Sequence, residues 1–164
     1  MTAHPESNPL EKLTISLSQP NASPPTVRVT VTNRNAYPVT IVSYGSPLDE
    51  IALPLGLLHI TPSGASKCLD LNVIRGSRIW PPEPHHLIGL RPGESGTNDV
   101  VLQAPTVPMQ HVGKGATVFL QGKWIGVFPR TKHELTASDL NHMFSQPGSF
   151  RGRFRSENLE IAIE

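Results

Sequence analysis

The strongest constraint on the fold of this chain is a repeated alternation of apolar and polar residues. In residues 12–18 (KLTISLS) and 26–33 (TVRVTVTN), every second side chain is leucine, isoleucine or valine. Successive side chains of a β-strand point to opposite faces, so each segment would have one apolar face and one polar face. A third segment of strand-like composition, residues 37–44, follows after a short polar connection. The three segments together predict an antiparallel meander.

The proline content extends this prediction to the rest of the chain. The sequence has 17 prolines in 164 residues, which is about twice the usual share. Proline neither donates to a β-ladder nor continues a helix, so short strands joined by turns and long loops are favoured. Further strands are predicted at residues 68–76, on both sides of a Pro-Gly turn in 87–102, in two pieces within 115–128, and at 149–155 and 159–164.

These segments predict the all-β fold class. Their number and spacing favour an immunoglobulin-like antiparallel β-sandwich of about eight or nine strands. The core between its two sheets is expected to contain Val29, Val31, Ile41, Leu71, Leu90, Val118, Leu159 and Ile161.

One stretch starts like the helix of a zinc protease. In the motif H-E-x-x-H, two histidines one helical turn apart bind the metal. His133 and Glu134 match its first two positions, but Ala137 stands where the second histidine is needed. The motif is incomplete, and we expect neither a metal nor another cofactor.

The same stretch nevertheless predicts a short helix near residues 137–144. Thr136 and Asp139 have the spacing of a capping box, in which each side chain accepts a hydrogen bond from the other residue's backbone. Asp139 and His142 would share a face of this helix, but two ligands alone do not make a zinc site, and capping explains Asp139.

Length and charge restrict the organisation and the partners. A chain of 164 residues corresponds to one domain. We expect a flexible N-terminal segment at 1–10 and a single β-sandwich domain at 11–164. The net charge of +1 gives no general basis for binding nucleic acid or an anionic membrane. No apolar run reaches the roughly 18 residues that cross a bilayer.

Cys68 is the only cysteine, so the chain has no internal disulfide. We expect this residue to be a small buried apolar group and not a nucleophile. The first residues have neither the basic start nor the apolar stretch of a secretory signal. Both features favour a reducing, cytoplasmic location, although a fragment of a secreted protein would have the same features.

The order of the segments resembles a known family. The chain has VRVTVTNRNAYPVTIVSYGSPLDE at 27–50, LRPGESGTNDVVL at 90–102, TASDL at 136–140, then a Gly-Ser-Phe strand and SENLEIAIE at 156–164. This series resembles the propeptide of deuterolysin-type fungal neutral zinc metalloproteases. It is also similar in outline to small immunoglobulin-like inhibitors of intracellular proteinases. The likeness extends from about residue 10 to the end of the chain.

The resemblance implies a domain that chaperones and blocks an attached protease until it is cleaved away. The sequence departs from this pattern, because the catalytic domain with its complete H-E-x-x-H and the signal peptide are both missing. We therefore interpret the chain as a stand-alone fungal relative of the propeptide.

Two loops are the candidates for binding a protein partner such as a metalloprotease. Residues 46–66 and 76–88 are long, stiffened by prolines, and contain apolar side chains. Stiff loops lose little entropy on docking. The binding residues expected in them are Trp80, Pro81, Pro82, His85 and His86.

The alternative is a small fungal enzyme, for example an isomerase or cyclase acting on an apolar secondary metabolite. His85, His86 and Asp49 would supply its acid–base groups in a pocket between loops, because imidazole titrates near neutral pH. Adjacent residues of an extended segment point to opposite faces, so we do not expect His85 and His86 to bind one ion side by side. Fold class alone does not separate the two hypotheses.

One further strand has a basic face. Arg151, Arg153 and Arg155 alternate with Phe150 and Phe154. We interpret this stripe as a solvated face that protects a sheet edge, because binding of nucleic acid does not fit a net charge of +1.

Overall fold

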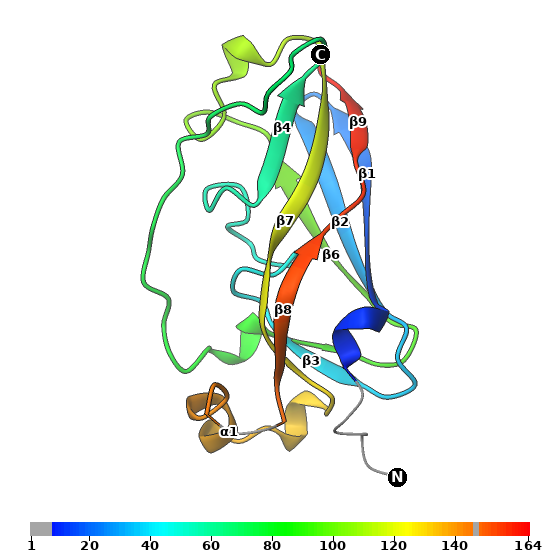
Figure 1. The fold of residues 1–164 in the computed structure, drawn as a ribbon, viewed down its shortest axis with the longest axis vertical. Coiled ribbons are helices and arrows are strands. Elements are labelled where there is room, and N and C mark those ends of the chain that lie inside the picture. Colours follow the sequence, from blue (N-terminus) through cyan, green and yellow to red (C-terminus); the bar gives the residue numbers. More distant parts are fainter. Residues whose placement is uncertain (1–7, 146–147) are drawn as a thin grey trace.

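The computed structural model describes residues 8–145 and 148–164, and it is a sandwich of two antiparallel sheets (Figure 1). The smaller sheet has the order β1-β2-β6. These strands are Leu13–Ala22, Pro25–Asn33 and Ser95–Val101. In β2, Val27, Val29 and Val31 are fully buried, as the alternation predicts.

The larger sheet is organised around its longest strand, β7 (Gly115–Phe128). The first half of β7 pairs with β4 (Leu58–Pro62) and β9 (Leu159–Ala162). Its second half pairs with β8 (Phe150–Arg155) and touches β3 (Val39–Val42), which in turn pairs with β5 (Leu87–Leu90). β7 therefore belongs both to the half of the sheet with β4 and β9 and to the half with β8 and β3.

Short helices occupy the ends and connections of the sandwich. The 3-10 helices are η1 (Pro9–Lys12), η2 (Pro84–His86), η3 (Met109–His111) and η4 (Lys132–Glu134), and the α-helix is α1 (Ala137–Asn141). The capping box is confirmed, because Asp139 N donates to Thr136 Oγ1 at 3.1 Å and Thr136 N donates to Asp139 Oδ2 at 2.8 Å. His133 precedes α1, as expected. In the described part of the chain, no helix has the length and hydropathy needed to cross a membrane.

The all-β sandwich, its nine described strands and the short helix confirm the predicted fold class. Of the predicted core, six residues are buried: Val29, Val31, Ile41, Leu90, Val118 and Ile161. Leu71 and Leu159 are only half-buried and pack against that core. Residues 1–7 of the expected flexible segment lie outside the described residues, whereas Pro9 and Leu10 belong to η1.

Several local predictions were wrong. The expected meander stops after two strands, because β2 pairs with β1 and β6 while β3 crosses to the other sheet. Residues 68–76 form no strand. Backbone amides of Leu69, Asn72 and Ile74 donate to Ile60, Thr106 and Pro54, respectively, so the segment meets three different neighbours instead of one ladder. Cys68 is exposed.

The two strand pieces expected in 115–128 are one continuous strand. Gly122 does not break it. A Cβ atom at Gly122 would come within 2.9 Å of the Phe154 ring and of the Gly45 carbonyl oxygen. Glycine is needed there because the aromatic ring of β8 packs directly over the strand. The expected loop 46–66 likewise contains a strand, since β4 begins at Leu58.

Candidate functional site

A buried ion pair organises the end of the sandwich that carries the predicted site residues. Asp49 is fully buried, and Arg78 donates to both of its carboxylate oxygens, at 2.8 and 3.1 Å. The backbone amides of Gly45 and Ile51 donate to the same carboxylate. Four donors thus surround Asp49, and the pair joins the connection after β3 to the connection before β5.

This environment fixes the charge of Asp49. Burial by itself raises the pKa of the carboxyl group, but the hydrogen bonds from Arg78, Gly45 and Ile51 outweigh it and hold the pKa below its usual value. The same pair raises the pKa of Arg78. A carboxylate that is ionised and already saturated with donors is a structural anchor. It is poorly suited to exchange protons with a substrate.

Above the ion pair, aromatic and cationic side chains form a continuous stack. The Arg78 guanidinium lies 4.0 Å from the centre of the Tyr44 ring. Tyr44 is followed by Trp80 at 6.3 Å, Trp80 by Phe144 at 5.9 Å, and Arg151 covers Phe144 at 5.2 Å. Tyr44 Oη also donates to the Ile79 carbonyl at 2.9 Å. These contacts hold the loop around Trp80 in one orientation.

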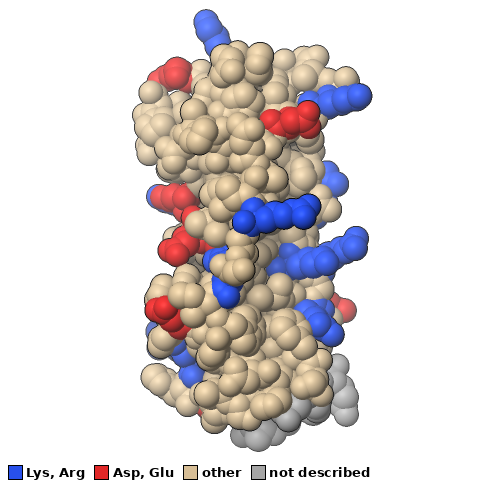
Figure 2. All heavy atoms as spheres, turned by 90° about the vertical axis from the view of Figure 1, so that its left-hand side faces the viewer, with Lys and Arg blue, Asp and Glu red and all other residues tan. Residues whose placement is uncertain are grey.

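The stack ends in an exposed apolar surface. Ile79 is 64 % exposed, Phe144 54 % and Trp80 39 %. We call these three residues the tryptophan patch. In Figure 1, its loop descends on the left and reaches the neighbourhood of α1. Figure 2 faces this side of the molecule and shows that most of its surface is uncharged. Large apolar side chains held in the open are typical of an interaction site.

The remaining predicted binding residues differ in how far they are exposed to solvent. Pro81 is exposed and directly follows Trp80, whereas Pro82 is buried. His85 is exposed and His86 is half-buried in η2. Two bonds fix η2 to its neighbours, since Ser43 N donates to the His86 carbonyl at 2.8 Å and Lys132 Nζ donates to the Pro84 carbonyl.

The expectation that the two histidines point to opposite faces was wrong. Residues 84–86 form a turn of 3-10 helix instead of an extended segment, and the His85 and His86 ring centres are only 3.9 Å apart. The glutamate that follows Asp49 also approaches them. One ligand atom of each of Glu50, His85 and His86 lies within 4.8 Å of the others. These are the described residues that could hold a metal together.

The residues predicted for the enzyme alternative, Asp49, His85 and His86, are brought to one end of the molecule. Asp49 is bound by Arg78, as described above. Three cavities of about 480, 280 and 380 Å³ occur in the described structure, and none of these three is lined by Asp49, His85 or His86. His85 is exposed and His86 is half-buried beside Tyr44.

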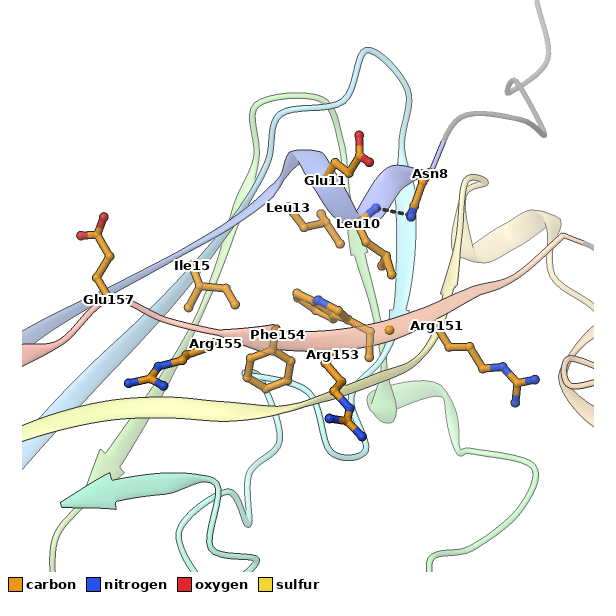
Figure 3. A pocket seen from close by; sticks show the side chains of 12 residues that line it. Asn8, Leu10, Glu11, Leu13, Ile15, Arg151, Arg153, Phe154, Arg155 and Glu157 are labelled. Atoms are coloured by element: carbon orange, nitrogen blue, oxygen red, sulfur yellow. Dashed lines mark hydrogen bonds between the residues drawn. The ribbon is translucent and has the colours of Figure 1, made fainter. Parts of the chain in front are cut away.

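The largest of these cavities lies beside the basic stripe (Figure 3). Its apolar wall includes Leu13, Ile15 and Phe154. Arg151, Arg153 and Arg155 are exposed, as expected, and Figure 3 shows their guanidinium groups directed away from the strand. Arg155 covers the Phe119 ring at 3.9 Å and Arg151 covers Phe144. Arg151 and Arg155 therefore each cover an aromatic ring.

Sequence reasoning missed three residues of this end: Tyr44, Arg78 and Phe144. Arg78 is 29 positions from its partner Asp49. No spacing rule connects them, and the unusual combination of an arginine next to the apolar Ile79-Trp80 pair was the one available signal.

Comparison with known proteins agrees with this architecture. Residues 12–163 match the sequence family described as immunoglobulin-like domain. Over 142 residues, the chain is 30% identical to a protein of Arthroderma benhamiae named "Uncharacterized secreted protein". The alignment covers 85% of this chain and 70% of that relative.

Proposed function

The chain belongs to the immunoglobulin-like domain family, and from this premise we propose that it is a non-catalytic protein-binding module of the protease-propeptide type. Its partner in this proposal is the catalytic domain of a deuterolysin-type metalloprotease, bound in trans. The resemblance of its segments to that propeptide supports this choice of partner.

The observation that carries the proposal is the tryptophan patch. Trp80 is exposed enough to enter a partner, yet it is fixed by Tyr44 on one side and Phe144 on the other. Tryptophan and arginine are the residues most enriched among the few that dominate binding energies. Because the loop is already ordered by the Asp49–Arg78 pair, little conformational entropy is lost on binding.

We also propose that the module acts outside the cell. The cytoplasmic location expected from the sequence has no support in the comparison, whereas the Arthroderma benhamiae relative is named as a secreted protein. Its fungal origin agrees with the expected source, and a secreted partner protease would be encountered there.

The enzyme hypothesis keeps one supporting observation, the convergence of His85 and His86 on one side of η2. Its predicted carboxylate, Asp49, is held by Arg78, and the carboxylate near the histidines is that of Glu50. We therefore rank it second.

The proposal is tested by measuring peptide hydrolysis by a deuterolysin-type protease in the presence of this protein. We expect the wild-type protein to slow hydrolysis. Trp80→Ala should weaken binding about thirtyfold, since loss of an interface anchor costs about 2 kcal/mol and 1.4 kcal/mol corresponds to a factor of ten. Thermal unfolding should show that the variant remains folded.

Val73→Ala is the matched control. Val73 is also exposed, at 56 %, and belongs to the same long connection, but it lies outside the patch. It should inhibit like the wild type. Absence of inhibition at micromolar concentration, or equal inhibition by Trp80→Ala, would rule out this role for the patch. Turnover of a small apolar substrate that is lost in His85→Ala would favour the enzyme.

A further inference from the structure

We propose that Glu50, His85 and His86 bind a divalent transition-metal ion of the zinc type. The inference concerns this chain alone and does not depend on the proposed protease partner. It also replaces the sequence-based expectation of no metal site, which rested on the incomplete motif at His133, on the pair Asp139 and His142, and on an extended conformation at residues 85 and 86.

The local backbone geometry brings the two histidines together. Pro84 opens the 3-10 turn η2, and this turn brings the neighbouring rings of His85 and His86 to a centre-to-centre distance of 3.9 Å. With Glu50, the three side chains place one ligand atom each within 4.8 Å of the others. Ligand atoms of a tetrahedral zinc ion at bond lengths of 2.0–2.1 Å lie about 3.3 Å apart. A shift of about 1.5 Å or less therefore closes the site.

The polar neighbours of the two imidazole rings indicate which nitrogen of each ring is free to bind the metal. Metal-binding histidines commonly hold a polar partner at the nitrogen that does not bind the metal. His86 Nδ1 lies 3.4 Å from Ser43 Oγ, and His85 Nδ1 lies 3.7 Å from Glu83 Oε2. Both polar neighbours are thus at Nδ1, and we assign the two Nε2 atoms as ligands. Glu83 and Ser43 are positioning residues in this scheme.

The two connections that supply the ligands are held in place by hydrogen bonds. Asp49, next to Glu50, is fixed by Arg78 and by two backbone amides, and Asn98 Nδ2 donates to the Asp49 carbonyl at 2.8 Å. His86 is fixed through its own carbonyl by Ser43 N. The backbone of the site is therefore formed before a metal arrives, and only the side chains must adjust, of which Glu50 and His85 are exposed and His86 is half-buried.

The ligand set selects the class of ion. Two imidazoles and one carboxylate suit zinc, copper or nickel, while calcium and magnesium prefer oxygen ligands throughout. Three protein ligands leave one position of a tetrahedral ion for water or for a side chain of a partner. The bound ion would join the connection after β3 to η2, next to the tryptophan patch.

The test is a titration of the chelator-stripped, desalted protein with zinc chloride, in competition with a chromogenic zinc indicator. We expect one zinc ion per chain and a rise in the thermal unfolding temperature. Glu50→Gln and His85→Ala, which change exposed side chains, should each weaken zinc binding at least about tenfold. His86→Ala should do the same, but His86 packs 4.9 Å from the Tyr44 ring, so its fold must be checked separately. Cobalt(II) should give the intense visible absorption of a tetrahedral complex, and Glu50→Gln should alter it.

His142→Ala and His133→Ala are the matched controls, because both remove an exposed histidine outside the cluster. Both should bind zinc like the wild type. The proposal is overturned if the wild type binds no zinc at a free zinc concentration 100-fold above the indicator's dissociation constant. It is equally overturned if binding survives Glu50→Gln and His85→Ala unchanged, or if it is lost in either control.

Discussion

The strand core and the loop end of this molecule are held together by different physics. We use strand core for the buried apolar residues of β2, β4 and β7, which include Val29, Ile60 and Leu120, all fully buried. The loop end comprises the Asp49–Arg78 pair, the stack from Tyr44 to Phe144, and η2. The strand core excludes water from apolar groups, whereas the loop end surrounds one charge with four donors and leaves three large apolar side chains exposed.

The difference shows why the loop end is the part suited to binding. Apolar burial is non-directional and tolerates many sequences, so it specifies a scaffold but no particular partner. The loop end uses directional bonds to hold exposed groups in place. If this interpretation is right, the two regions should respond differently to truncation and to pH.

The largest effect should follow truncation in the strand core. Leu120→Ala should lower the free energy of unfolding by about 3–5 kcal/mol, because it removes a fully buried side chain and leaves a cavity. Leu159→Ala removes the same atoms from a half-buried position on the same sheet and should cost clearly less. Urea unfolding followed by tryptophan fluorescence measures both. Equal costs would mean that β9 is packed as tightly as β7.

An intermediate effect should follow disruption of the loop end. Asp49→Ala should cost about 2–4 kcal/mol, because Arg78 and two backbone amides lose their acceptor, while Arg78 is exposed enough to regain some water. Asp99→Ala is the matched control. Its pair with Arg28 has the same 2.8 Å distance but both side chains are 45 % exposed, so little change is expected.

Asp49→Ala also separates stability from binding. The variant should lose protease inhibition at temperatures where circular dichroism still shows the folded sandwich, because the patch loses its anchor. Retained inhibition in a folded variant would show that the stack orders Trp80 without the ion pair.

The smallest effect on the free energy of unfolding should come from a change of pH. It distinguishes the regions because β4 contains the titrating group His59 and the loop end contains Asp49. Burial of His59 in β4, with the nearby charge of Arg155, lowers the pKa of its imidazole from the usual value for histidine. In the loop end, the pKa of Asp49 lies below the usual value for aspartate because its hydrogen bonds outweigh its burial. Both groups bind a proton less readily in the folded state. Each therefore contributes its full stability above the unfolded pKa and loses it as pH falls through the lower folded pKa.

Two separate windows of acid destabilisation are expected. His59 should act as pH falls below the ordinary histidine pKa of about 6.5, and Asp49 as it falls below the ordinary aspartate pKa of about 3.9. One proton changes the free energy of unfolding by at most about 1.4 kcal/mol per pH unit. Urea unfolding at successive pH values measures the two slopes. His59→Gln should flatten the upper window and leave the lower one intact; a profile unchanged by His59→Gln would contradict the assigned shift.

Much of the strand core could be predicted from the sequence because the cause is local. Alternation in residues 12–18 and 26–33 fixes which side chains share a face, and Thr136 with Asp139 fixes the start of α1. Leu69 and Leu71 show the limit of this reasoning. They alternate like a strand and pack against the core, but their backbone has no common partner strand.

The sequence by itself therefore determined the all-β class, most buried positions, the capped helix and the exposed arginine stripe. The tertiary structure alone decided that β3 leaves β2 for the other sheet, that Gly122 lies within one continuous strand, and that Arg78 pairs with Asp49. It also decided that His85, His86 and Glu50 meet. The physical reason is the distance along the sequence over which each interaction acts. Alternation and capping act between residues a few positions apart, whereas an ion pair or a ligand cluster depends on how distant connections are brought together when the sheets close over the core.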